Sequence, residues 1–281
     1  MNIENLLNQS INILKSKKNS SASLDSELIL AKTLNVSRES LLIDLNKEVS
    51  KKKVKDFHNF LIQRINQKPI AYIIGKKDFW KSSFVVNENV LIPRPDSELI
   101  VEEALKLIKI KKSYKILDIG TGSGCILLSI LKQSTKSKGI GLDISHKALK
   151  IANLNAKLQQ LDNRVKFIKS DIDNYNSSNY DIIVSNPPYI KKYCIKSLEE
   201  DVKYFEPNIA LDGGPKGETL IEKVIFKSSK IIKRRGKLIL EINSDQVFFA
   251  KNKLTKNGFY LVKIIKDLSG HSRCIVATKL K

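Results

Sequence analysis

A glycine-rich loop between two apolar segments is the feature that most constrains the fold of this chain. Residues 115–119 form a short apolar run typical of a buried strand, and residues 125–131 have the apolar spacing of a helix. Between them, residues 118–124 read DIGTGSG. Glycines at such a strand-to-helix turn let a ligand approach the backbone closely, next to the N–H groups that begin the helix. The segment therefore predicts an α/β domain with a ligand at this turn.

The same alternation of strand and helix patterns continues to the end of the chain. We expect further strands at residues 138–143, 165–168, 180–185 and 237–242, followed by a final pair of strands. We expect helices at residues 145–160, 218–232 and 246–256, besides one that begins near residue 97. This alternation is typical of a mostly parallel sheet with helices on both faces. Ligands of such sheets bind at the carboxyl ends of the strands.

The N-terminal part has only helical patterns and predicts a small bundle. Asp25 and Ser37 are candidate N-caps, and Pro69 should end or bend the last long helix. Because the bundle contains no catalytic motif, we expect it to hold a partner. Two short strand-like runs then predict a β-hairpin linker, so that three parts are expected: a helical domain at 1–74, a linker at 75–95 and an α/β domain at 96–281.

The composition argues against several classes of protein. The formal net charge is +21, but only seven of the 50 basic residues are arginine, so we attribute the charge to composition and expect no stable nucleic-acid binding. Cys125, Cys194 and Cys274 lack the spacing of metal ligands, and we expect no metal. No apolar stretch is long enough to span a membrane, and the first residues do not resemble a signal peptide. We expect a cytoplasmic protein.

Three carboxylates indicate which ligand the glycine loop binds. Cys125 stands where a dinucleotide-binding loop needs its third glycine, and no phosphate-binding lysine follows the loop. Instead the loop begins with Asp118, which suits a cationic ammonium group. Asp143 ends the second strand, where an acid can accept hydrogen bonds from ribose hydroxyls. Asp171 follows the third strand, in position for the amino group of adenine. Together these features predict S-adenosylmethionine.

The corner Asn186-Pro187-Pro188-Tyr189 predicts that the methyl acceptor is a planar nitrogen group. It follows an apolar strand, which two prolines cannot continue because neither has an N–H to donate. The side-chain oxygen of Asn186 and the carbonyl of Pro187 can each accept one hydrogen of an NH2 group, and Tyr189 offers a flat face for stacking. From these residues alone, a protein amide and a nucleobase remain open, as does a mere turn.

These motifs and four others resemble the release factor glutamine N5-methyltransferases, the PrmC/HemK family of class I S-adenosylmethionine-dependent methyltransferases. The other four lie at residues 91–98, 205–207, 211–214 and 267–273. The resemblance covers nearly the whole chain. It implies a Rossmann-like domain with a mostly parallel seven-stranded sheet, and methylation of the glutamine in the Gly-Gly-Gln motif of peptide chain release factors. We also expect a monomer.

The residues and the resemblance together give a set of expected site residues. Those expected to bind the cofactor are Asp118, Gly120, Thr121, Gly122, Ser123, Gly124, Asp143, Asp171, Ile172 and Asn186. Those expected to bind the substrate are Asn186, Pro187, Pro188 and Tyr189, of which Asn186, Pro187 and Tyr189 are the expected catalytic residues. Ile172 departs from the family, which often has an aromatic residue at this position, so apolar packing would replace ring stacking on adenine.

Three other functions remain as alternatives. A ribosomal-protein glutamine methyltransferase would share the corner and the helical domain, although residues 92–96 favour the release-factor branch. A methyltransferase for nucleobase amino groups would need an arginine-rich, aromatic-lined surface, which the sequence does not suggest. A nucleotide-sensing module without catalysis would leave the corner without a purpose.

Overall fold

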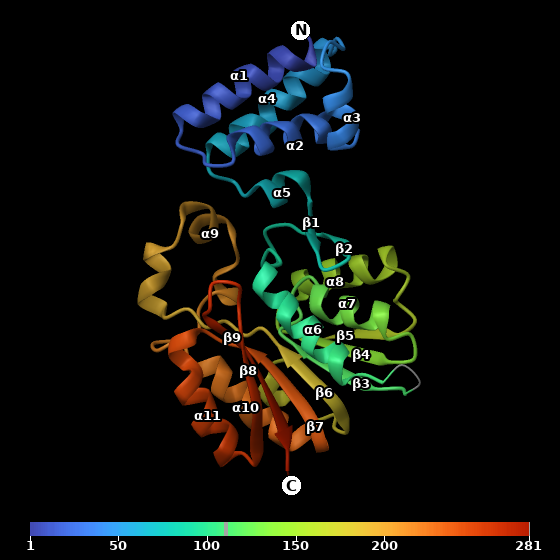
Figure 1. Ribbon diagram of the computed structural model, residues 1–281, viewed down its shortest axis with the longest axis vertical. Helices are drawn as coiled ribbons and strands as arrows, with labels where there is room; N and C mark the ends of the chain where they lie inside the picture. Colours follow the sequence, from blue (N-terminus) through green and yellow to red (C-terminus); the bar gives the residue numbers. More distant parts are fainter. Residues whose placement is uncertain (110–111, 281) are drawn as a thin grey trace. The chain divides into compact units, whose positions relative to one another are not determined.

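The computed structural model describes residues 1–109 and 112–280, and the chain divides into two compact units. The first unit comprises Met1–Lys76 together with Glu199–Phe205, and the second comprises Lys77–Leu198 with Glu206–Lys281. The short helix α9 (Glu200–Phe205) thus belongs to the first unit although it is flanked by residues of the second. Figure 1 follows the chain through both units.

The first unit is the predicted helical bundle. Its helices from the N-terminal part are α1 (Ile3–Ser16), α2 (Ala22–Leu34), α3 (Arg38–Ile43), α4 (Lys51–Ile65) and α5 (Ile70–Ile74). Each of the longer helices turns an apolar stripe inward, because its apolar residues recur every three or four positions. The core that these stripes form includes Leu6, Leu14, Ile29, Leu30 and Phe57.

The two N-caps expected in this unit have different outcomes. Ser37 caps α3, since its hydroxyl accepts the Ser40 N–H at 3.1 Å. The prediction for Asp25 is wrong, because α2 begins at Ala22 and Asp25 lies inside the helix, buried. Its carboxylate pairs with Arg64 of α4 at 2.6 Å. A buried carboxylate needs such a partner, so Asp25 joins two helices instead of starting one.

The second unit contains the predicted hairpin and a seven-stranded sheet. The hairpin pairs β1 (Lys76–Phe79) with β2 (Ser82–Val85). The strand order of the sheet is β5-β4-β3-β6-β7-β9-β8, and the five strands from β5 to β7 run parallel while β9 is antiparallel to both of its neighbours. The strands are β3 (Lys115–Ile119), β4 (Lys138–Asp143), β5 (Val165–Lys169), β6 (Tyr180–Ser185), β7 (Ile232–Glu241), β8 (Phe259–Lys266) and β9 (Ser272–Lys279). The expected mostly parallel sheet is confirmed.

Helices cover both faces of this sheet (Figure 1). One face packs against α6 (Glu98–Leu107), α7 (Cys125–Gln133) and α8 (His146–Leu158), and the other against α10 (Thr219–Ile231) and α11 (Val247–Lys256). Neighbouring residues of β3 illustrate the two cores, since Ile116 joins the first and Leu117 the second. Burial on both faces explains why the central strands β3 and β6 are largely apolar without polar alternation.

The strand order fixes where a ligand can bind. The chain builds β3, β4 and β5 outward in one direction and then returns to place β6 on the other side of β3. At such a reversal the loops after the two central strands diverge and leave a crevice at their carboxyl ends. Ile119 at the end of β3 lies opposite Ser185 at the end of β6. The glycine loop and the Asn186 corner therefore leave the sheet side by side.

Candidate functional site

A cavity of about 450 Å³ lies in the second unit at the carboxyl ends of β3, β4, β5 and β6. Small-molecule sites generally have volumes of roughly 300–1,000 Å³, so the cavity has the size of a cofactor site. Many of the residues expected from the sequence line it. They are Gly120, Gly122, Asp143, Asp171, Ile172, Asn186, Pro187 and Pro188.

The glycine loop presents uncovered backbone to the cavity. Gly120 and Gly122 have φ angles of +74° and +55°, a conformation that side chains disfavour, and a Cβ added to either would meet nothing within 4 Å. The N–H groups of Gly120 and Thr121 both donate to the carbonyl of Leu142 in β4, at 2.9 and 2.8 Å. The loop is thus held from behind and open in front, as close approach by a ligand requires.

Asp143 stands at the end of β4 with both carboxylate oxygens oriented by backbone. Its Oδ2 accepts the Gly122 N–H and its Oδ1 accepts the Ser145 N–H, both at 2.9 Å. Burial raises the pKa of this carboxyl, while the same backbone donors act in the opposite direction. Each oxygen retains further acceptor capacity. The carboxylate can therefore accept hydrogen bonds from two neighbouring hydroxyls of a ligand.

Asp118 lies behind the loop and does not line the cavity. Its Oδ2 accepts the Thr121 hydroxyl at 2.7 Å, whereas its Oδ1 has no hydrogen-bond partner among the described residues. Burial raises the pKa of Asp118 to about 7, and the charge of Asp143 adds to the effect. A buried acid with an unused oxygen favours a cation nearby. Other expected cofactor residues outside the cavity wall are Thr121, Ser123 and Gly124.

The segment after β5 forms another part of the wall. Asp171 accepts the Asp173 N–H at 3.0 Å and so caps the short 3-10 helix η2 (Ile172–Asn174). Ile172 is buried and belongs to the core of the adjacent sheet face, so it presents a rigid apolar edge to the cavity. Lys223 of α10, which the sequence analysis missed, also lines the cavity and pairs with Asp173 at 2.5 Å.

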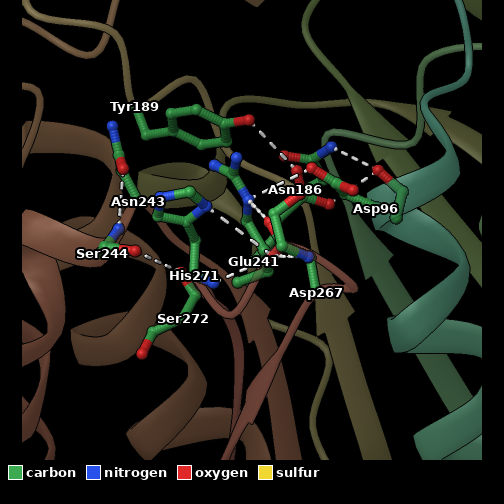
Figure 2. A network of polar contacts seen from close by, with 12 residues as sticks. Asp96, Asn186, Tyr189, Glu241, Asn243, Ser244, Asp267, His271 and Ser272 are labelled. Atoms are coloured by element: carbon green, nitrogen blue, oxygen red, sulfur yellow. Dashed lines mark hydrogen bonds and ion pairs between the residues drawn. The ribbon is translucent and has the colours of Figure 1, made fainter.

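The Asn186 corner forms the part of the wall beside the loop, with Pro187 and Pro188. The amide nitrogen of Asn186 donates to the Ser97 hydroxyl at 2.9 Å, and that hydroxyl donates to Oε2 of Glu241 at 2.6 Å. Figure 2 shows Asn186 and Glu241 within this polar network. Because the nitrogen end of the amide is used by Ser97, its oxygen end is left for a ligand.

Tyr189 has a different environment from the one that the sequence suggests. It does not line the cavity, and its hydroxyl donates to Oε1 of Glu241 at 3.2 Å (Figure 2). Burial and the nearby charge of Glu241 both raise the pKa of the Tyr189 hydroxyl. Its backbone carbonyl accepts the side-chain N–H of Gln246 at 3.0 Å. Stacking of Tyr189 on a substrate stays a prediction, and the contacts seen here instead anchor the corner.

Two further segments contribute to the cavity wall. Residues 89–91 and 207–210 both line the cavity. Glu206 joins them, since its buried carboxylate accepts the Ile92 N–H at 3.3 Å and pairs with Arg94. The contact spans more than a hundred positions, so no local pattern reveals it. The motifs at 91–98 and 205–207 contain Arg94 and Glu206, but neither motif indicates which residue the other contacts.

Residues 1–109 and 112–280 contain neither a candidate metal site nor a candidate membrane-spanning helix. Within that part of the chain, no three His, Cys, Asp or Glu side chains gather closely enough to hold a metal ion. None of the helices there is both long and apolar enough to cross a membrane.

Comparisons with known proteins agree on one family. The family "PrmC N-terminal domain" matches residues 5–75, and "Methyltransferase small domain" matches residues 96–198. A release factor glutamine methyltransferase of Caulobacter vibrioides is 36% identical over 258 residues, which are 92% of this chain and 89% of the relative. A second, from Clostridium acetobutylicum, is 33% identical and aligns over 99% of both chains.

A solved structure supports the fold. A methyltransferase from Pyrococcus furiosus superposes with a TM-score of 0.54 at 19% identity, over 79% of this chain and 99% of that one. At this level of identity the likeness concerns the fold alone.

Proposed function

Because this chain belongs to the release factor glutamine methyltransferase family, we propose that it methylates the side-chain amide nitrogen of the glutamine in the Gly-Gly-Gln motif of peptide chain release factors. The methyl donor is S-adenosylmethionine, and S-adenosylhomocysteine is the other product. The observation that carries the proposal is the Asn186 corner, whose amide oxygen is left for a ligand in a cavity shared with the glycine loop.

The residues of the cavity suit this cofactor. S-adenosylmethionine supplies a methyl group made electrophilic by a positively charged sulfur. We assign the ribose hydroxyls to Asp143, whose two oxygens are already oriented, and the close backbone approach to Gly120 and Gly122. The unused, buried oxygen of Asp118 favours the cationic end of the cofactor near the start of the glycine loop. Asp171 and Ile172 are assigned to the adenine.

The corner is proposed to orient the acceptor nitrogen. An amide nitrogen is a poor nucleophile because its lone pair is delocalised, so position and electrostatics must supply most of the rate. Asn186 Oδ1 and the Pro187 carbonyl each accept one hydrogen of the glutamine NH2 group. This aligns the nitrogen with the methyl group. As the nitrogen–carbon bond forms and the sulfur–carbon bond breaks, the nitrogen releases one proton, which we assign to water.

The remaining proposals concern the binding of the release factor, the oligomeric state and the cellular location of the protein. We propose that the N-terminal helical part, expected at residues 1–74, holds the release factor and that 75–95 links it to the catalytic part at 96–281. The first unit has a core of its own, which such a separate task requires. We further propose that the protein acts as a monomer in the cytoplasm.

A labelling experiment tests this function. The protein is incubated with methyl-tritiated S-adenosylmethionine and, in separate reactions, with a release factor, a ribosomal protein or ribosomal RNA. We expect label only on the release factor, and none when the glutamine of its Gly-Gly-Gln motif is replaced by alanine. Label on RNA alone, or on the ribosomal protein alone, would contradict the proposal.

A further inference from the structure

Behind the Asn186 corner, polar side chains from separate segments form a hydrogen-bonded chain. Ser97 ends the 3-10 helix η1 (Pro95–Ser97), Asn186 follows β6, and Glu241 ends β7. The links are Asn186 Nδ2 to Ser97 Oγ at 2.9 Å and Ser97 Oγ to Glu241 Oε2 at 2.6 Å. Ser97 and Glu241 are only 3% and 1% exposed. Neither lines the cavity, so both affect a ligand through the residues that they contact, and Asn186 is the one of these that lines the cavity.

The direction of each hydrogen bond follows from the chemistry of Glu241. An ionised carboxylate only accepts hydrogen bonds, and a serine hydroxyl has a single hydrogen. Once Ser97 gives that hydrogen to Glu241, only its lone pairs remain for Asn186. They can bind the NH2 end of the amide but not its oxygen end. The chain therefore has one direction, from Asn186 through Ser97 to Glu241.

This direction sets which end of Asn186 is available to the substrate. If the Asn186 amide were turned over, its oxygen would face the Ser97 oxygen without a hydrogen between them. Its NH2 group would then face the substrate, where Oδ1 now lies. A buried hydrogen bond would be lost and a polar group left unpaired, which favours the observed orientation by roughly ten- to a hundredfold. An NH2 group in that place would meet the hydrogens of the incoming glutamine.

We propose that Ser97 and Glu241 are positioning residues that hold the Asn186 amide with its oxygen toward the substrate nitrogen. The inference rests on the proposed function, in which that oxygen accepts an amide hydrogen of glutamine. It assigns a task to two buried polar residues that lie outside the cavity wall.

The surroundings of Glu241 make the hydrogen bonds between Asn186, Ser97 and Glu241 sensitive to pH. Burial raises the pKa of Glu241 to about 7, and the charge of Asp96 adds to this. The Ser97 and Tyr189 hydroxyls and the Arg273 guanidinium act in the opposite direction. Arg273 is itself shared, since it pairs with Asp96 at 3.1 Å and with Asp267 at 2.8 Å (Figure 2).

Protonation of Glu241 removes the fixed direction of the hydrogen bonds from Asn186 through Ser97 to Glu241. A protonated carboxyl can donate its own hydrogen to Ser97, which then is free to donate to Asn186 Oδ1. The amide can turn over at little cost, so turnover should fall as the pH drops below about 7. Cys274, which faces Glu241 across the β7–β9 pair, stays a neutral thiol because burial raises its pKa further. It does not compete as a charged acceptor.

The first test compares three serine variants in turnover of a release factor at saturating cofactor. Ser97→Ala should lower kcat by roughly ten- to a hundredfold, whereas Ser97→Thr, which keeps a hydroxyl, should recover most of it. Ser228→Ala is the matched control, because Ser228 is also fully buried but its hydroxyl has no partner within the described chain. Its kcat should stay within about twofold of the unaltered protein. Affinity for S-adenosylmethionine, measured by calorimetry, should be similar in all three.

The second test uses the pH profile of kcat, which a purely structural role would not shift. Glu241→Gln can still accept from Ser97 through its amide oxygen but cannot titrate. Its NH2 group can also donate to Ser97, as a protonated carboxyl does, so kcat should be nearly the same at every pH and close to the value that the unaltered protein reaches well below pH 7. Glu241→Leu, which offers no acceptor, should lose turnover at every pH.

The outcomes separate this inference from the proposed function. If the unaltered protein labels no release factor, the proposed function fails, and with it the positioning role of Ser97 and Glu241. If it does label the release factor but Ser97→Ala turns over as fast as Ser228→Ala, the positioning role alone is wrong. The same conclusion follows if Glu241→Gln keeps the acidic decline of the unaltered protein.

Discussion

The glycine-loop half of the cavity and the Asn186 half are held in place by different means. On the loop side the ligand-facing surface is backbone, and the carboxylate of Asp143 is oriented by N–H groups within a few residues of it or one strand away. On the corner side a single amide is oriented by Ser97 and Glu241, which lie 89 and 55 positions from it. One half is set by local geometry and the other by the assembled fold.

This difference separates affinity from rate. The loop half offers hydrogen bonds that a cofactor gains equally before and during the reaction, so changes there should affect binding. The corner half offers acceptors to a nitrogen that must be aligned as it reacts, so changes there should affect kcat. Variants in the two halves should therefore fall into two kinetic classes.

The largest effect is expected for Asn186→Ala. Removing an oriented hydrogen-bonding group at a reaction centre costs about a hundredfold or more in turnover. The affinity for S-adenosylmethionine should change little, because the loop half is untouched. Turnover of a release factor and calorimetry measure the two quantities. Asn257→Ala, which removes an amide that donates to the Lys253 carbonyl of α11, is the control. Near-normal turnover of Asn186→Ala would refute the role of the corner.

Asp143→Ala tests the loop half in the same way. Loss of a charge-assisted contact should weaken cofactor binding by about 1–3 kcal/mol, while kcat at saturating cofactor stays close to that of the unaltered protein. Titration calorimetry gives the affinity directly. Glu102→Ala removes an exposed acid of α6 and should leave affinity unchanged. Equal affinities in the two variants would exclude Asp143 from the site.

Asp118→Asn should change how stability depends on pH. Burial raises the folded-state pKa of Asp118 to about 7, whereas an exposed Asp in the unfolded chain has a pKa of about 4. Between these values the folded state holds a proton that the unfolded state has released. The free energy of unfolding should therefore fall as the pH rises from about 4 to 7, by at most about 1.4 kcal/mol per unit for this group. Urea unfolding at several pH values should show a shallower fall for Asp118→Asn, and parallel curves would contradict the assignment.

The smallest effect is expected for Ile172→Val at the adenine wall. The change removes one buried methylene, which should lower the free energy of unfolding by about 0.5–1.5 kcal/mol. Cofactor affinity should fall by at most about fourfold, the equivalent of one methylene. A loss of binding well beyond this, in calorimetry, would show that Ile172 does more than shape the wall.

The same division between local and distant contacts decides what could be predicted from the sequence. The bounds of β3 and β4 match the expectation because each is an apolar run that ends at a glycine or an acid. The start of β7 was missed by five residues, since Lys233, Arg234 and Arg235 interrupt the apolar pattern and Arg235 has a φ of +64°. Residues of one motif were easy to assign because neighbours in sequence share a turn.

Residues of the site that depend on distant partners could not be predicted. Ser97 stood within a quoted motif, but nothing near it in sequence indicates a contact with Glu241, 144 positions later. The same holds for Asp25, which was expected to be a cap and is instead paired with Arg64. In each case a buried polar group finds its partner only after the helices and strands have packed.

We propose that the Asn186 corner directs a methyl group to a glutamine amide. Mass spectrometry of a release factor, treated with the protein and S-adenosylmethionine, tests this most directly. We predict that the peptide containing Gly-Gly-Gln gains the mass of one methylene group on its glutamine, and that Asn186→Ala yields almost none. An unmodified glutamine with the unaltered protein, or equal modification by Asn186→Ala, would contradict the account.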